Sequence, residues 1–132
     1  MITYDNNFQN STAKLLRTLF PDGNGQDMPT RVFRFLEEAL ELAQALNCTE
    51  AQAHELVRYV FNRPVGVPYQ ELGGTMVTLA ALSHVMGESM MLAGWEELER
   101  CNRPEVIAKI QAKQKSKPNP NGPLPGTAPE EG

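Results

Sequence analysis

The sequence predicts an all-α fold, and three observations support this prediction. Apolar residues recur at steps of three and four over long stretches, the spacing that places them on one face of a helix. No stretch alternates apolar and polar residues over a useful strand length. The 132 residues are 41% hydrophobic and 21% charged, which is typical of one globular domain. Helical segments with short connections favour a four-helix bundle.

Residues 1–28 predict a short helix followed by a loop. Ser11 is a candidate N-cap for this helix, which we expect to end before Pro21. Residues 21–28 are mostly turn formers and predict the loop. The apolar residues of the short helix are Leu15, Leu16 and Leu19.

The strongest helical pattern covers residues 29–46. Pro29 suits the first turn of a helix, where its missing N–H group has no partner to lose. The apolar residues fall within one arc of the helix: Val32, Phe35, Leu36, Ala39, Leu40, Ala43 and Leu46. The opposite side carries the charged residues: Arg34, Glu37, Glu38 and Glu41.

Two more helices follow in the sequence. Thr49 and Gln52 form the pattern of a capping box, which predicts a helix over 50–61. Prolines and a glycine then break the chain. A third helix is predicted over 69–86, with Gly87 as its C-terminal cap.

The last helical region covers residues 88–115, and we expect Gly94 and Pro104 to divide it. The main helical domain is therefore predicted over 29–115. Residues 116–132 are rich in Pro and Gly and nearly free of apolar side chains. Such a segment buries too little surface to offset its ordering entropy, so we expect a disordered or extended tail outside the fold.

The overall composition excludes several classes of protein. Twelve Lys and Arg against sixteen Asp and Glu give a net charge of −4, which argues against a dedicated nucleic-acid binder. No apolar run approaches the roughly 20 residues that span a membrane. The N-terminus lacks the pattern of an export signal, and two cysteines suit free thiols. We therefore expect a cytoplasmic protein.

The first candidate for chemistry is the acidic group Glu37, Glu38 and Glu41. Their spacing of three and four residues brings the head groups together on a helix. One interpretation is a solvated acidic face, with Arg34 offsetting the repulsion. The other is a site for a hard cation such as Mg²⁺, which prefers oxygen ligands.

The second candidate is Glu71, which is followed closely by Gly73 and Gly74. Each glycine inside a helix costs about 1 kcal/mol relative to Ala. The pair indicates close helix packing, a late helix start or room for a ligand beside Glu71. Helices of a bundle can point carboxylates at one shared metal, and Glu38, Glu41 and Glu71 suit that arrangement.

These two elements resemble the MazG-like, all-α nucleoside triphosphate pyrophosphohydrolases. The family pattern is Glu-Glu-x-x-Glu on one helix and Glu-x-x-Asp on a later one. Residues 34–46, RFLEEALELAQAL, match the first element, and residues 71–82, ELGGTMVTLAAL, match the second in placement. The likeness covers about residues 30–115. It implies a helical bundle of the all-α NTP pyrophosphatase type that assembles into dimers or tetramers.

The resemblance implies Mg²⁺-dependent hydrolysis of a nucleoside triphosphate to the monophosphate and pyrophosphate, with Mn²⁺ as a substitute metal. Glu38, Glu41 and Glu71 would hold the metal. Glu37 would be an outer ligand or the base that orients the attacking water, and Glu37 and Glu38 are the candidate catalytic residues.

Basic residues are the expected phosphate ligands. Members of the family hold phosphates with basic side chains late in the last helix, where this chain has Lys109, Lys113 and Lys117. Arg34 is a further substrate-binding candidate. A basic helix end that is favoured by the helix dipole is the other interpretation of the lysines.

Gly74 departs from the family pattern, which has Asp at this position. Three outcomes stay open: Glu37 or water completes the metal shell, the enzyme is slow, or the chain binds nucleotides without cleaving them. The alternative function is therefore a degenerate protein that binds or sequesters nucleotides.

Overall fold

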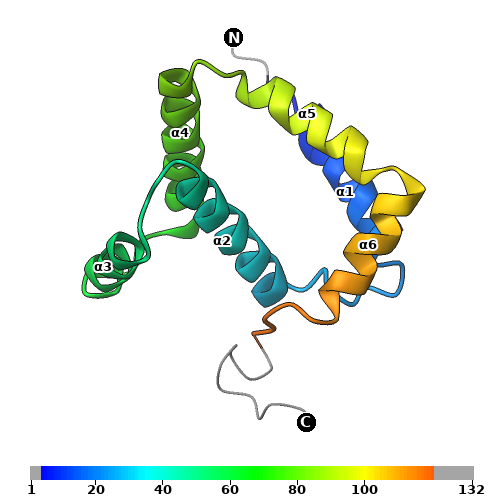
Figure 1. The fold of residues 1–132 in the computed structure, drawn as a ribbon, viewed down its shortest axis with the longest axis horizontal. Coiled ribbons are helices and arrows are strands. Elements are labelled where there is room, and N and C mark those ends of the chain that lie inside the picture. The colour runs from blue at the N-terminus through cyan, green and yellow to red at the C-terminus, as the bar shows by residue number, and fades with distance from the viewer. Residues whose placement is uncertain (1–3, 121–132) are drawn as a thin grey trace. The chain divides into compact units, whose positions relative to one another are not determined.

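The computed structural model describes residues 4–120, which form helices joined by loops and contain no strand. The all-α prediction is therefore confirmed. The greater part of the predicted tail, 121–132, lies outside the described residues. The helices, shown in Figure 1, are α1 (Asn7–Leu19), α2 (Met28–Ala45), α3 (Glu50–Phe61), α4 (Pro68–Met86), α5 (Met90–Cys101) and α6 (Pro104–Gln114).

Two predicted helix ends have the expected local chemistry. At the start of α3, the Thr49 hydroxyl accepts a hydrogen bond from the backbone N–H of Gln52 at 3.1 Å. The Gln52 side chain accepts one in return from the backbone N–H of Thr49 at 2.9 Å. At the end of α4, Gly87 has φ +74°, a left-handed conformation that glycine adopts without strain. Both predictions are confirmed.

Two other boundary predictions are wrong. α1 begins at Asn7, so Ser11 lies inside the helix, and Asp5 accepts a hydrogen bond from the backbone N–H of Asn7 at 2.7 Å. Gly94 lies inside α5 and does not divide it, because a single helical glycine costs only about 1 kcal/mol. Pro104 does begin a new helix, since its ring and missing donor exclude it from a helix interior.

The chain divides into two compact units. Unit 1 comprises residues 1–37 and 95–132, and unit 2 comprises residues 38–94. The predicted domain boundaries at 28 and 115 remain predictions.

Unit 1 contains the apolar core of the described residues. Its α1 lies against α6, and the Phe8 ring meets the Trp95 ring edge-on with centroids 5.2 Å apart. The Gln111 side chain donates a hydrogen bond to the Leu19 carbonyl at 3.0 Å, which ties α6 to the end of α1. The buried cluster consists of Leu15, Leu19, Phe20 and Leu98, with Phe8, Leu16, Cys101, Ile107 and Ile110 around it.

Unit 2 has no comparable core. Ser83 is its only buried residue, although α4 carries apolar side chains around its whole circumference and has Glu71 as its only Asp, Glu, Lys or Arg. A helix that is apolar all round is normally covered by other elements. Within residues 4–120, no single helix is long and apolar enough to cross a membrane, and only the bent pair of α4 and α5 meets that test in combination.

Candidate functional site

The predicted metal ligands lie on two helices of unit 2. Glu38 and Glu41 are on the second half of α2, and Glu71 is in the first turn of α4. All three side chains are exposed. The carboxylates of Glu41 and Glu71 form no hydrogen bond or ion pair with any other residue between 4 and 120. These two groups therefore have no structural task within the described chain.

The donor types suit Mg²⁺, which prefers carboxylate oxygens. In the part of the chain that the structure describes, however, no three His, Cys, Asp or Glu side chains are grouped closely enough to hold a metal ion. The convergence of Glu38, Glu41 and Glu71 on one ion is therefore still a prediction.

Gly66 is a contributor to this region that the sequence analysis missed. It lies in the connection before α4, and the Glu71 carboxylate contacts the space that a Cβ atom would fill there. A larger residue at 66 would displace the head group of Glu71. The sequence signal for this contact was the position of Gly66, between Pro64 and Pro68 and shortly before the candidate ligand Glu71.

Gly73 and Gly74 lie inside α4, so a late start of the helix does not explain them. A Cβ atom at either position would meet no atom within 4 Å. Close packing against another described element therefore does not explain them either. Room for a ligand, or for a second molecule, is the interpretation that survives.

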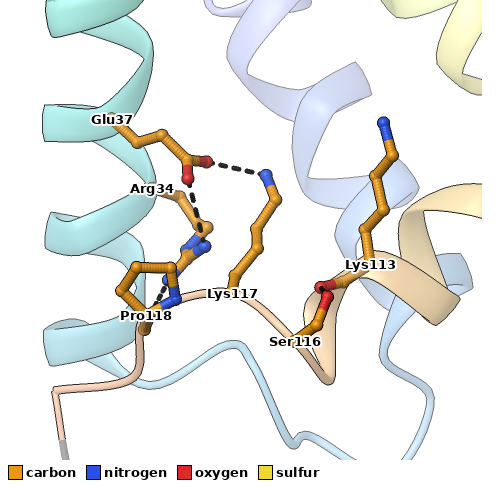
Figure 2. Close-up of polar contacts among 6 residues, drawn as sticks. All are labelled: Arg34, Glu37, Lys113, Ser116, Lys117 and Pro118. Atoms are coloured by element: carbon orange, nitrogen blue, oxygen red, sulfur yellow. Dashed lines mark hydrogen bonds and ion pairs between the residues drawn. The ribbon is translucent and has the colours of Figure 1, made fainter. Parts of the chain in front are cut away.

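Glu37 is part of an ion-pair network in unit 1 (Figure 2). Its Oε1 accepts a hydrogen bond from Lys117 Nζ at 2.7 Å, and its Oε2 lies 3.6 Å from Arg34 Nη1. Arg34 Nη2 also donates to the Pro118 carbonyl oxygen. Both carboxylate oxygens of Glu37 are thus already paired with cations.

These contacts change the interpretation of the residues after α6. Lys117 and Pro118 were predicted to belong to a tail outside the fold, yet both contact α2. The sequence pattern missed this because one ammonium and one carbonyl anchor the segment, and neither leaves an apolar periodicity.

Two other predicted phosphate ligands, Lys109 and Lys113, lie on α6 and are exposed. The Lys113 carbonyl accepts a hydrogen bond from the Ser116 hydroxyl at 3.1 Å. Figure 2 shows the Lys113 side chain extending from α6, and within 4–120 its ammonium forms no ion pair. Arg34 and Lys113 both belong to unit 1.

Arg31 is a second residue that the sequence analysis missed. Its guanidinium lies 5.2 Å from the centroid of the Phe20 ring. Burial, followed by the nearby charge of Arg34, lowers the pKa of Arg31 below its usual range. Asp27 has the opposite effect on the pKa of Arg31. Hydrogen bonds from the hydroxyl and backbone N–H of Thr30 lower the pKa of Asp27, and this carboxylate favours the charged form of Arg31.

Several donors of this arginine pair have no acceptor among the described residues. They are Nε and Nη2 of Arg31 together with Nε and Nη1 of Arg34, and all four atoms are buried. A buried donor without an acceptor typically costs about 1–3 kcal/mol. The pair is therefore an unusual feature of unit 1.

Comparisons with protein-family models, with curated protein sequences and with solved structures each find no match to this chain.

Proposed function

We propose that the protein hydrolyses a nucleoside triphosphate to the nucleoside monophosphate and pyrophosphate in a Mg²⁺-dependent reaction. The observation that supports the proposal best is a set of exposed carboxylates in the MazG-like pattern. Two of them, Glu41 and Glu71, have no polar partner within residues 4–120. Carboxylates without a structural task, on helices that can face one another, are what a hard-cation site requires.

In the proposed reaction, Glu38, Glu41 and Glu71 would hold the metal, with Mn²⁺ as a substitute. The bound ion would neutralise the substrate phosphates and lower the pKa of a water molecule. Because Lys117 and Arg34 already pair with Glu37, we assign Glu37 to an outer position, where it orients water. Glu38 is then the first choice for the residue whose loss stops the reaction.

Arg34, Lys109 and Lys113 are the proposed phosphate ligands. Arg34 has a planar fork of donors that suits phosphate oxygens. Lys113 carries an ammonium without an ion-pair partner in the described chain, so it is available to an anion.

The alternative function is a protein that binds or sequesters nucleotides without efficient turnover. The observation that favours it is Gly74, which stands where the family pattern has Asp. Loss of one carboxylate removes a ligand and a negative charge from the metal site, although Mg²⁺ readily keeps several waters in its shell.

We also propose that the protein is a homo-oligomer, a dimer or tetramer, acting in the cytoplasm. Apolar side chains of α2, α3 and α4 are exposed, including Phe61 at 84% and Leu72 at 68%. A second copy that covers them would complete a helical bundle of the NTP pyrophosphatase type. The same association can bring α2 and α4 carboxylates to one metal.

The direct test incubates the pure protein with a panel of ribo- and deoxyribonucleoside triphosphates and Mg²⁺ or Mn²⁺. We expect release of pyrophosphate and monophosphate, with at least about a hundredfold loss of rate in Glu38→Gln. Glu55→Gln is the matched control, because Glu55 is an exposed acid of unit 2 whose ion pair, with Arg58 at 3.6 Å, involves no proposed site residue. Tight nucleotide binding without turnover in the wild-type protein would establish the sequestering alternative.

Gly74→Asp tests the mechanism more closely. Since a Cβ at Gly74 meets nothing within 4 Å, the described chain can accept the larger residue. We expect the metal affinity and the rate to rise together. If the variant folds but loses both, the glycine provides space for substrate or for a second copy, and the lost-ligand account is wrong.

A further inference from the structure

Two arginines at the start of α2 carry more donors than the described residues satisfy. Arg31 and Arg34 are three residues apart, about one helical turn. Each has two buried guanidinium nitrogens without a hydrogen-bond acceptor in the described chain, although Arg34 Nη1 lies 3.6 Å from Glu37 Oε2 in an ion pair. The Arg34 side chain is only 12% exposed. Buried polar groups in proteins are nearly always hydrogen-bonded, so such donors indicate a water or an ion as partner.

Five charged groups have established contacts at the pair within residues 4–120. Arg31, Arg34 and Lys117 are positive, while the carboxylates beside them are Glu37 and Asp27. Among these five groups, three are cations and two are anions, an excess of one positive charge. An oxyanion would remove this excess, whereas a water molecule would not.

The geometry of the arginines also suits an anion with several oxygens. The Phe20 ring lies 5.2 Å from the guanidinium of Arg31 and restricts the plane of that group. A fixed planar fork donates two parallel hydrogen bonds to a phosphate or carboxylate. Arg34, one turn along the same helix, offers a second fork.

A polar pocket of about 320 Å³ lies in the same unit, and Arg31, Arg34 and Lys117 are not among the residues that line it. It is lined by Asn24, Gly25, Asp27, Thr30, Gln114 and Asn119. Thr30 directly precedes Arg31 in the chain, and Asn119 directly follows Pro118. Residues 116–118 follow the end of α6, where the backbone N–H groups of Ser116 and Lys117 donate to the Lys113 carbonyl at 3.0 and 3.1 Å.

We infer that Arg31, Arg34 and Lys117 form an oxyanion site that takes a phosphate or pyrophosphate group. The anion accepts hydrogen bonds from both guanidinium groups and replaces the Pro118 carbonyl as partner of Arg34. It likewise competes with Glu37 for Lys117. The site shares Arg34 with the proposed phosphate ligands, but it uses none of the proposed metal ligands and needs no metal, so binding in EDTA tests it apart from the hydrolysis.

The test is calorimetric titration of the full-length protein with inorganic phosphate and pyrophosphate in EDTA, at constant ionic strength. We expect saturable binding that weakens at least about tenfold in Arg31→Gln. Arg58→Gln is the matched control, because Arg58 is an exposed arginine of α3 paired with Glu55 at 3.6 Å. It should bind as the wild type does.

A second variant tests the site if Arg31→Gln fails to fold. Lys117 lies outside the helices, so Lys117→Gln interrupts no helix, and we expect it to weaken binding severalfold. Absence of saturable binding to the wild-type protein, or equal affinity in all variants, would overturn the site and leave water as the partner of the arginines.

The two proposals fail separately. Pyrophosphate binding in EDTA without any nucleotide turnover in Mg²⁺ supports the oxyanion site and removes the hydrolase. If nucleotide turnover is the same in Arg31→Gln as in the wild type and no anion binds in EDTA, the hydrolase is supported and the oxyanion site is removed. If a nucleoside triphosphate displaces pyrophosphate in EDTA, the site accepts nucleotide phosphates; if only phosphate and pyrophosphate bind, it is a site for the free anions.

Discussion

Unit 1 buries a cluster of apolar residues, whereas unit 2 leaves its large apolar residues exposed or half-buried. In unit 1, Leu15, Leu19 and Phe20 are each 7% exposed and pack with Leu98. In unit 2, the leucines, valines and aromatics of α3 and α4 are exposed, and Ser83 is the only buried residue. The two units have similar helical content, so helix formation does not separate them.

The difference shows what each unit needs from its surroundings. Unit 1 stabilises its helices by burying their apolar faces against one another, the usual source of helix stability in proteins. Unit 2 has the same kind of side chains without internal partners. This exposed apolar surface is the one that we propose a second copy covers, and the residues of the proposed metal site, Glu38, Glu41 and Glu71, belong to the same unit.

The largest expected effect tests the core of unit 1. Leu19→Ala removes a buried side chain and leaves a cavity, so we expect a loss of about 3 kcal/mol in the free energy of unfolding. Leu72→Ala, at a position 68% exposed in unit 2, should cost less than about 0.5 kcal/mol in the monomer. Urea denaturation at low protein concentration measures both. Equal losses would remove the contrast between the units.

The second prediction concerns assembly through unit 2. Met76 on α4 is 62% exposed, and Met28, at the start of α2 in unit 1, is 76% exposed. A charge buried in an interface is costly, so Met76→Glu should shift the protein from oligomer to monomer in light scattering. Met28→Glu should leave the oligomer intact. If both variants assemble as the wild type does, α4 is not an interface.

The third prediction links unit 2 to the proposed metal site. Gly66→Ala places a methyl group where the Glu71 carboxylate lies, so we expect Mn²⁺ affinity to fall severalfold with little change in stability. Gly73→Ala is the control, because its Cβ meets no atom within 4 Å. It should stabilise α4 by up to about 1 kcal/mol and bind Mn²⁺ normally. Metal titration followed by electron paramagnetic resonance distinguishes the two variants.

The smallest effect concerns a surface ion pair of unit 1. Arg100 Nε donates to Glu97 Oε2 at 3.0 Å, and this hydrogen bond lowers the pKa of Glu97 from 4.5. The pair therefore stabilises the fold above about pH 4.5, and its contribution disappears as the pH falls through the lower pKa of the folded state.

Both side chains of this pair are more than half exposed, so the contribution is only a few tenths of a kcal/mol. Glu97→Gln should cost that amount at pH 7 and nothing near pH 3, as measured by the pH dependence of urea denaturation. A loss at pH 7 comparable with that of Leu19→Ala would show that the core is not the main support of unit 1.

Local patterns predicted the helices well because their causes are local. The capping box at Thr49 and the left-handed Gly87 each involve residues within one turn of the chain. Where a local rule was weak, the prediction failed: Ser11 resembles a cap but lies inside α1, and Gly94 is tolerated inside α5.

The candidate site was predicted less completely. Spacing along one helix placed Glu38 and Glu41 together without any tertiary information. The relation of those residues to Glu71 depends on how two helices pack, and the described chain does not group the three. Gly66 and Arg31 were missed because a glycine under a carboxylate and a guanidinium over a ring are contacts in space, not patterns in the sequence.

The sequence by itself determined the helical class, most helix ends and the positions of the acidic residues, because each follows from hydrogen bonds and periodicity within a few residues. Tertiary structure alone decided which apolar faces are buried and which stay exposed. It also brought Lys117 onto Glu37 and Pro118 onto Arg34, across 80 and 84 residues of the chain. Such contacts depend on the path of the whole chain, which no local pattern encodes.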